Sequence, residues 1–192
     1  MAIFRKKVDT TESDAAREHR LGLIDGLTFE VVPMKSLTGA LEHLPAGAEV
    51  SVTCSPAKGI EETQRITEDL TEQGYVAIPH ISARMVRDRA HTAELAAWFR
   101  TVGIDRIFIV GGDYEDAGDY PGAVEFLRDL LDTDNGLRTV GVTAYPDGHA
   151  FLSDEIVRNA LADKEQLARS AGVEMYCSTQ MCFDPTTIAK WM

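Results

Sequence analysis

The sequence predicts an α/β fold, and in particular a (β/α)8 barrel of the TIM type with about six of its eight βα units present in this chain. Short apolar runs alternate with longer amphipathic stretches and no succession of hairpins occurs, which favours a parallel sheet. A TIM barrel uses roughly 250 residues for eight units, or about 31 for each unit. At that rate the 192 residues of this chain correspond to about six units. The competing fold is a doubly wound sheet, but the glycine-rich turn that usually follows its first strand is absent here.

Six strands are expected where β-branched, aromatic and apolar residues run together between turn residues. They cover residues 27–32, 49–53, 75–79, 106–110, 139–144 and 174–179. Helices are expected between them because apolar side chains recur every three or four positions, over residues 60–73, 92–102, 122–131 and 153–171. The last of these helices begins at a Ser153 cap and ends before Gly172. One more helix, over 14–23, precedes the first strand.

The chain therefore divides into an N-terminal extension with a helix over residues 1–26 and a single, incomplete barrel domain over residues 27–192. With six strands instead of eight, the first and last strands would each have one open edge, which exposes backbone hydrogen-bonding groups. We expect a homo-oligomer, or strands supplied by another chain. A non-catalytic or truncated barrel fragment is the alternative that the sequence leaves open.

The composition is that of a globular protein, with 44% hydrophobic and 26% charged residues. Thirty-one acidic residues against nineteen basic ones give a net charge of −12, so nucleic acid and anionic membranes are not expected partners. No signal peptide precedes the first charges and no run of eighteen apolar residues occurs, so we expect a cytoplasmic protein. A metal site is not expected, because the three cysteines and five histidines show none of the usual ligand spacings.

Polar residues stand where the expected strands end, and a barrel carries its chemistry at the carboxyl ends of its strands. They are Glu30, Thr53, His80, Asp113, Tyr145 with His149, and Thr179 with Gln180. Glu30 lies within the apolar stretch Thr28-Phe29-Glu30-Val31-Val32-Pro33, where a buried carboxylate is costly unless it is paired. This environment is typical of a general acid. Asp113 follows two glycines, which allow backbone amides to approach a ligand closely.

Several segments together resemble one enzyme family. They are TFEVVP, VTCSPAKG, AIPHISAR, GIDRIFIVGGD, VGVTAYPDGHA and AGVEMYCSTQMCFDP, in that order along the chain. Their order and spacing resemble the methylenetetrahydrofolate reductases over about residues 27–185. The resemblance implies a (β/α)8 barrel and a flavin oxidoreductase in which NADH or NADPH reduces FAD. The flavin then passes hydride to 5,10-methylenetetrahydrofolate and gives 5-methyltetrahydrofolate.

The resemblance also implies roles for individual residues. Glu30 resembles the general acid that opens the five-membered ring of the folate by protonation, and Asp113 resembles the carboxylate beside flavin and folate. Gln180 is similar to the amide that holds the pterin or nicotinamide, and Met181, Cys182 and Phe183 would enclose it, with Phe183 also contacting substrate. The positions that resemble cofactor contacts are Thr53, His80, Gly112, Asp113, Ala123, Tyr145, His149 and Lys164.

Three positions depart from the family pattern. Gly111 stands where the family has an arginine, Gly122 where an aromatic residue precedes Ala123, and Ala168 where a phosphate-binding lysine is expected. Lys164 lies one helical turn before Ala168 and is its substitute in this interpretation. Each departure removes a contact to FAD. The sequence therefore leaves open a second reading, in which reduced nicotinamide and folate bind together and hydride passes directly between them without a flavin.

Overall fold

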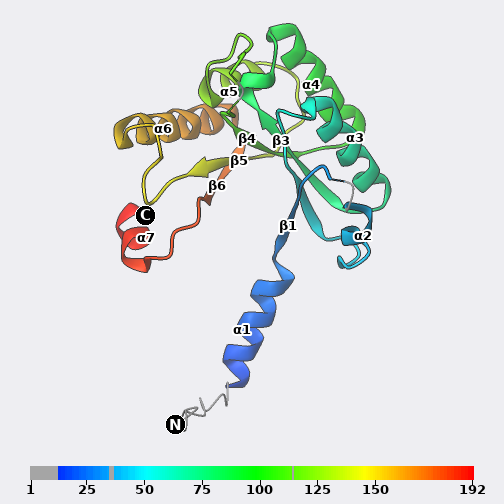
Figure 1. The fold of residues 1–192 in the computed structure, drawn as a ribbon, viewed down its shortest axis with the longest axis vertical. Coiled ribbons are helices and arrows are strands. Elements are labelled where there is room, and N and C mark those ends of the chain that lie inside the picture. The colour runs from blue at the N-terminus through cyan, green and yellow to red at the C-terminus, as the bar shows by residue number, and fades with distance from the viewer. Residues whose placement is uncertain (1–12, 35–36, 114) are drawn as a thin grey trace, which may run out of the picture.

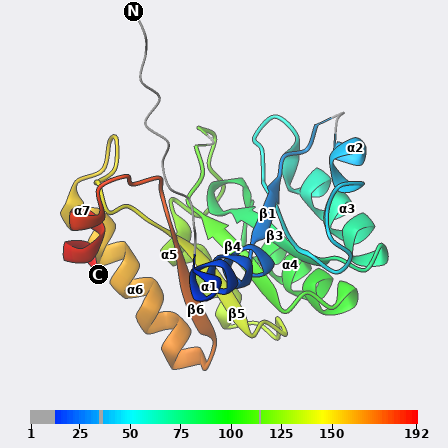
Figure 2. The same cartoon turned by 90° about the horizontal axis from the view of Figure 1, so that it is seen from below.

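The computed structural model describes residues 13–34, 37–113 and 115–192. Within these ranges a curved parallel sheet carries helices on its convex side (Figures 1 and 2). Residues 1–12 of the expected N-terminal extension lie outside the described residues.

Six parallel strands form the sheet in the order of the sequence. They are β1 (Thr28–Val31), β2 (Glu49–Val52), β3 (Val76–Ser82), β4 (Arg106–Val110), β5 (Thr139–Ala144) and β6 (Glu174–Thr179). Each strand pairs with the next, so β1 and β6 are the two edges of the described sheet. All strands run in the same direction, and their carboxyl ends therefore meet on one side.

Most of the helices connect successive strands, whereas the first helix precedes the first strand and the last helix follows the last strand. The helices are α1 (Asp14–Asp25), α2 (Leu37–Leu41), α3 (Gly59–Glu72), the short 3-10 helix η1 (Ala83–Met85), α4 (Arg89–Val102), α5 (Ala123–Leu131), α6 (Asp154–Ala171) and α7 (Pro185–Trp191). The predicted α/β class with a parallel sheet is confirmed, and its six strands curve into half of a barrel (Figure 2). The predicted eight-unit barrel remains a prediction.

The third strand extends three residues beyond its expected end at Pro79. Pro79 pairs with Val52 of β2, whereas the pairing of β3 with β4 begins one residue later, at His80. Proline has no backbone N–H to donate, and it stands here at the position where the pairing of β3 passes from β2 to β4. Because the strand continues, Ser82 also becomes part of the sheet.

Apolar side chains of the strands form the core on the convex side. One cluster joins β3, β4 and β5 to α4 and α5 and contains Phe99 and Phe126, both fully buried. A smaller cluster joins Val50 and Val52 of β2 to Ile66 and Leu70 of α3. Successive strand side chains point to opposite faces, so the residues between these apolar positions face the concave side.

Helix α1 contrasts with the rest of the fold because none of its residues is buried. It extends away from the amino ends of the strands (Figure 1). Exposed apolar side chains occupy its last turns, among them Leu21, Leu23 and Ile24. Among the described helices, none combines the length and the apolar composition that crossing a bilayer requires.

Candidate functional site

Two neighbouring hollows occur in the described part of the molecule. One, called the concave hollow, lies on the concave face of the sheet, and the other, called the rim cleft, lies at the carboxyl ends of the strands. The concave hollow measures about 570 Å³, and its lining includes Glu30, Ser51, His80, Phe108, Tyr176 and Gln180. The rim cleft measures about 670 Å³, and its lining includes Ser82, Gly112, Asp113, Ala123, His149 and Lys164. Val110, Thr143 and Tyr145 line both. Residues that lie far apart in the sequence thus share two neighbouring spaces of a size common for ligand sites.

Glu30 extends from β1 into the concave hollow with 60% of its side chain exposed. The expectation that this carboxyl is buried is therefore wrong. Its neighbour Val31 turns to the convex face and joins the core there, while Glu30 points the other way. Since β1 is also an edge strand, the concave face beside Glu30 is open.

His80 faces Glu30 from the third strand. Its Nε2 atom lies 3.8 Å from Oε2 of Glu30, and only 11% of the His80 side chain is exposed. The imidazole packs on the ring of Phe108, with 4.7 Å between the ring centres. Burial lowers the pKa of His80 to about 4, so the ring is neutral at pH 7. A neutral imidazole offers one N–H donor and one acceptor nitrogen.

An ion pair lies at the amino-terminal end of the concave face. Arg106 donates from Nη1 to Oε1 of Glu49 at 2.8 Å, across the intervening strand β3. Thr28 donates to the other oxygen of Glu49 at 3.0 Å. Above this pair, Gly141 has no side chain, and a Cβ atom there would lie 2.4 Å from both Phe108 and Tyr176. The two rings therefore approach the backbone of β5 and form the floor of the hollow.

In the rim cleft, the backbone approaches closely at Gly112. This residue has a φ of 89°, and a Cβ atom added to it would lie 1.9 Å from Oγ of Ser82. The Ser82 hydroxyl is buried and has no hydrogen-bond partner among the described residues. Helix α5 begins after Gly122, which lines the same cleft, and has no side-chain cap. Free N–H groups at a helix start and an unpartnered hydroxyl both suit an anionic ligand group.

Lys164 of α6 contributes a buried cation to the rim cleft. The residue is 6% exposed, and no hydrogen-bond or ion-pair partner of its ammonium occurs among the described residues. Burial lowers the pKa of Lys164, an effect that the nearby Cys177 opposes. Ala168, one turn later, is 1% exposed and packs in the interior. Lys164 is thus the residue by which α6 presents a charge to the cleft.

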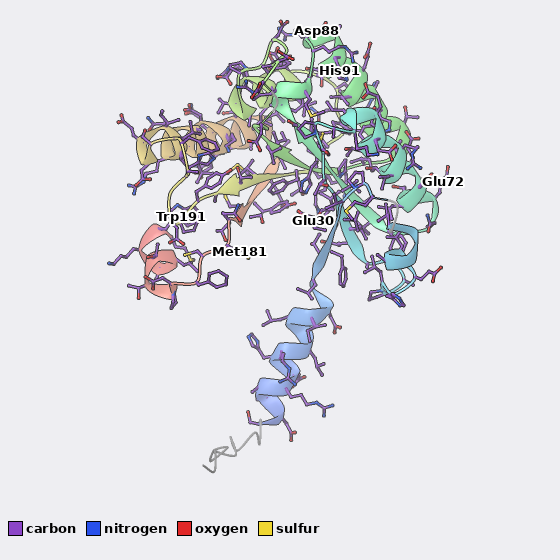
Figure 3. All side chains as sticks on the ribbon, viewed as in Figure 1. Glu30, Glu72, Asp88, His91, Met181 and Trp191 are labelled. Atoms are coloured by element: carbon purple, nitrogen blue, oxygen red, sulfur yellow. The ribbon has the colours of Figure 1, made fainter. Side chains whose placement is uncertain are left out.

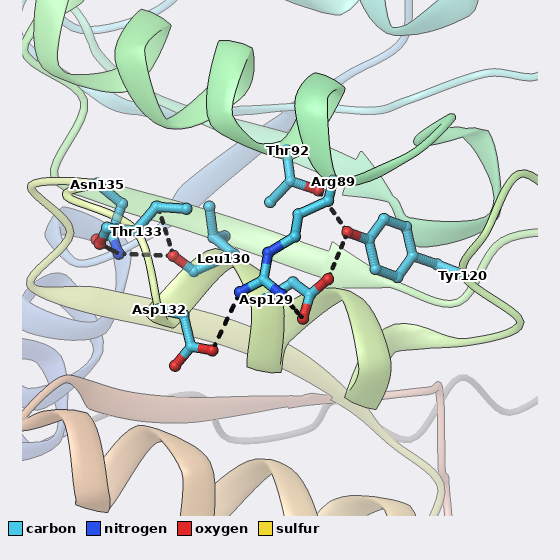
Figure 4. A network of polar contacts seen from close by, with 8 residues as sticks. All are labelled: Arg89, Thr92, Tyr120, Asp129, Leu130, Asp132, Thr133 and Asn135. Carbon is cyan, nitrogen blue, oxygen red and sulfur yellow. Dashed lines mark hydrogen bonds and ion pairs between the residues drawn. The ribbon is translucent and has the colours of Figure 1, made fainter.

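A polar network joins Tyr120, which precedes α5, to α4 and α5 (Figure 4). The buried Tyr120 hydroxyl lies 2.9 Å from Oγ1 of Thr92 and donates to Oδ2 of Asp129 at 2.9 Å. Arg89 lies 3.4 Å from Asp132 and 4.0 Å from Asp129. Tyr120 thus contacts both α4 and α5, and Arg89 joins the same two helices.

The chain after β6 differs from the expectation. Gln180 lines the concave hollow, and its Oε1 accepts a hydrogen bond from the backbone N–H of Met181 at 2.9 Å. Met181 and Phe183 are exposed, Phe183 by 87%, so the expected apolar enclosure of Gln180 is absent. Figure 3 places Met181 close to α7, on the segment that follows β6. Cys182 donates to Asp147 at 3.2 Å and so connects this segment to the loop after β5.

The other expected site residues lie near the strand ends. Tyr145 and His149 meet edge to face at 4.7 Å on the wall of the rim cleft. Asp113 is exposed at the mouth of the same cleft. Thr53 follows β2, and its buried Oγ1 has no partner among the described residues. Phe183 lines neither of the two hollows.

Sequence reasoning missed Ser82 and Arg84. Ser82 stands two positions after His80, and alternate residues of a strand lie on the same face. The expected strand stopped at Pro79, so this relation between the two residues was not used. Arg84 lines the rim cleft, and its guanidinium lies near the backbone carbonyls of Pro121 and Glu115, at 3.5 and 3.4 Å. Arg84 ends the segment AIPHISAR, but that segment assigned no role to this arginine.

No family model matches the chain. Among solved structures, the crystal structure of the citrate synthase SbnG matches with 14% sequence identity and a TM-score of 0.38. The match covers 91% of this chain and 84% of that chain. At this similarity the match assigns no activity to the protein. Within the described ranges, no three His, Cys, Asp or Glu side chains are grouped as a metal site would require.

Proposed function

We propose that the protein is an NAD(P)H-dependent oxidoreductase that reduces 5,10-methylenetetrahydrofolate to 5-methyltetrahydrofolate. One observation carries the proposal. Glu30 of the edge strand β1 and Gln180, which follows the edge strand β6, line a single hollow that shares a wall with the cleft of Asp113 and Lys164. An acid, an amide and an anion-binding cleft are thus arranged around neighbouring spaces, as this reaction of a flat heterocycle requires.

The residues of the rim cleft fit a flavin dinucleotide. Lys164 and Arg84 would hold its diphosphate, assisted by the start of α5 and by the unpartnered Ser82 hydroxyl. Tyr145 and His149 offer ring surfaces at the same wall. When bound, FAD would supply the two-electron transfer between nicotinamide and folate.

The residues of the chain would act on the folate. Glu30 gives a proton to one ring nitrogen, and the bond from that nitrogen to the bridging carbon breaks with its electron pair moving to the nitrogen. The lone pair of the other nitrogen forms the carbon–nitrogen double bond of an electrophilic iminium. The Asp113 carboxylate favours this positive charge. The Gln180 amide donates and accepts hydrogen bonds at the edge of the heterocycle and so fixes its orientation.

Direct hydride transfer without a flavin is the second candidate. It is favoured by Ala168, which is buried and carries no charge at the position of the family's phosphate-binding lysine, and by Gly111, which has no side chain for a phosphate contact. Both candidates place the folate chemistry on Glu30 and differ only in the carrier of the electrons.

The test measures NADH and NADPH oxidation that depends on methylenetetrahydrofolate, with and without added FAD, and the absorbance spectrum of the purified protein. Glu30→Gln should lower kcat by about 100-fold or more, because it removes the proton donor. Glu72→Gln, on the outer helix α3 (Figure 3), is the matched control and should leave kcat unchanged. No folate-dependent oxidation would refute the proposal. Turnover of a colourless protein that gains no flavin would select the second candidate.

The proposal extends to the fold and the assembly. The curvature of the six strands supports a (β/α)8 barrel, and the two open edges support a homo-oligomer. Light scattering with size-exclusion chromatography tests the assembly, and a monomer at micromolar concentration would contradict it.

A further inference from the structure

We infer that His80 is a positioning residue for Glu30, acting as the hydrogen-bond donor that orients its carboxyl and stabilises the carboxylate left after proton donation. The inference rests on the proposed function. It gives His80 a role different from the cofactor contact that the family resemblance implies.

The arrangement of the two side chains carries the inference. Nε2 of His80 faces Oε2 of Glu30 at 3.8 Å, just beyond direct hydrogen-bond length. The His80 ring is held by its packing on Phe108, whereas the Glu30 side chain is largely exposed. An exposed side chain changes rotamer within nanoseconds, so Glu30 closes the remaining gap while His80 stays in place. One carboxyl oxygen then meets the imidazole and the other faces the hollow.

Several ionisable side chains on the concave face besides His80 are candidates to orient the Glu30 carboxyl. The other ionisable side chains that line the concave hollow are Tyr145, Tyr176 and Cys177. Glu49 and Arg106, on the same face, already bind one another at 2.8 Å. The low pKa of His80 keeps its ring neutral, so the ring neither competes for the proton nor forms a charged pair with Glu30. The hydrogen bond from the neutral Nε2–H of His80 becomes stronger when Glu30 loses its proton and becomes a carboxylate.

His80 also lies apart from the cleft proposed for the dinucleotide. Lys164, Asp113 and His149 line that cleft, and His80 does not. A loss at His80 should therefore appear in the proton-donation step and leave dinucleotide binding unchanged.

The first experiment combines the substitution with a double-mutant cycle. His80→Leu removes the donor and should lower kcat by about 10- to 100-fold, the value of a hydrogen bond to a charged group. KM for the folate should change by less than about threefold, because the interaction strengthens only in the transition state. His80→Gln keeps an N–H donor and should recover most of the loss. In a Glu30→Gln background, His80→Leu should have almost no further effect.

The inference would be overturned if His80→Leu lowered kcat by the same factor in the wild-type and Glu30→Gln backgrounds. It would also be overturned if His80→Leu raised the KM for the dinucleotide and left kcat unchanged. Urea unfolding of each variant identifies any that fail to fold, and His80→Gln serves as the test in that case.

The second experiment needs no turnover. Nitrogen-15 NMR of the labelled histidines should show His80 as the neutral Nε2–H tautomer at pH 7, with a signal that shifts in Glu30→Gln. The Nδ1–H tautomer, or a signal indifferent to residue 30, would refute the pairing. A protein without folate-dependent oxidation refutes the proposed function, while this measurement still decides the contact itself.

Discussion

Gly112 is the residue whose backbone most directly shapes the rim cleft. Its φ of 89° is rarely adopted by residues with a side chain, and a Cβ atom would clash with Ser82. The preceding Gly111 has no atom within 4 Å of an added Cβ and no such backbone angle. The two adjacent glycines therefore have different reasons to be present, and only the second is required by geometry.

This difference predicts the outcome of two substitutions. Gly112→Ala should lower the free energy of unfolding by about 1–3 kcal/mol, the cost of strain at such a backbone position. Gly111→Ala is the matched control and should change it by less than about 0.5 kcal/mol. Urea unfolding followed by circular dichroism measures both, and equal effects of the two substitutions would contradict the geometric argument.

His80 predicts a dependence of stability on pH. Its folded pKa of about 4 lies below the ordinary value of 6.5, because burial disfavours the charged ring. Between these values the unfolded chain binds more protons, so stability rises with pH there. The contribution is fully present above about pH 6.5 and is lost as pH falls toward 4.

The wild-type protein should therefore lose about 2 kcal/mol more than His80→Gln between pH 7 and pH 4.5. Chemical unfolding of both proteins at the two pH values measures the difference. Burial also lowers the pKa of His91, but this residue is common to both proteins and cancels in the comparison. Parallel losses in the two proteins would show that His80 titrates normally.

At the scale of elements, α1 and α6 begin with the same capping chemistry in different surroundings. Ser13 accepts a hydrogen bond from the N–H of Ala16, and Ser153 accepts one from the N–H of Ile156. Helix α6 packs on the sheet through Lys164 and Ala168, whereas α1 has no buried residue. An unpacked helix of this length is marginal in water.

The same substitution should therefore give different results in the two helices. Ser153→Ala should lower the free energy of unfolding by about 1 kcal/mol, the usual value of a serine cap. Ser13→Ala should reduce helical circular dichroism slightly and leave the unfolding midpoint unchanged. A shift of the midpoint by Ser13→Ala would mean that α1 is packed in solution.

The elements also show what the sequence could predict. Strand ends were placed correctly at residues 106–110, 139–144 and 174–179, because apolar runs bounded by turn residues define them. Helices α2 and η1 were missed, since neither is long enough to show an apolar period. For the site residues, the sequence predicted a position near a strand end but could not predict how exposed each side chain is. The exposure of Glu30 depends on which strand is an edge, and that is a property of the whole sheet.

At the scale of the molecule, stability should fall from the centre of the sheet toward its edges. Strand β4 is paired on both sides and covered by buried side chains, whereas β1 and β6 each lack one neighbour. Hydrogen exchange should therefore be slowest in β4, faster in β1 and β6, and fastest in α1. Mass spectrometry of exchanged peptides measures this order. Protection of α1 equal to that of β4 would contradict it and would indicate that another surface covers the helix.

The wall shared by the two hollows has a consequence for the order in which molecules arrive. Because Val110, Thr143 and Tyr145 belong to both spaces, an occupant that displaces them from one side alters the room left on the other. Thermodynamic linkage makes this influence reciprocal, so each occupant must change the affinity of the other by the same factor. Two molecules bound in the adjoining hollows would then influence one another's affinity through these three shared residues.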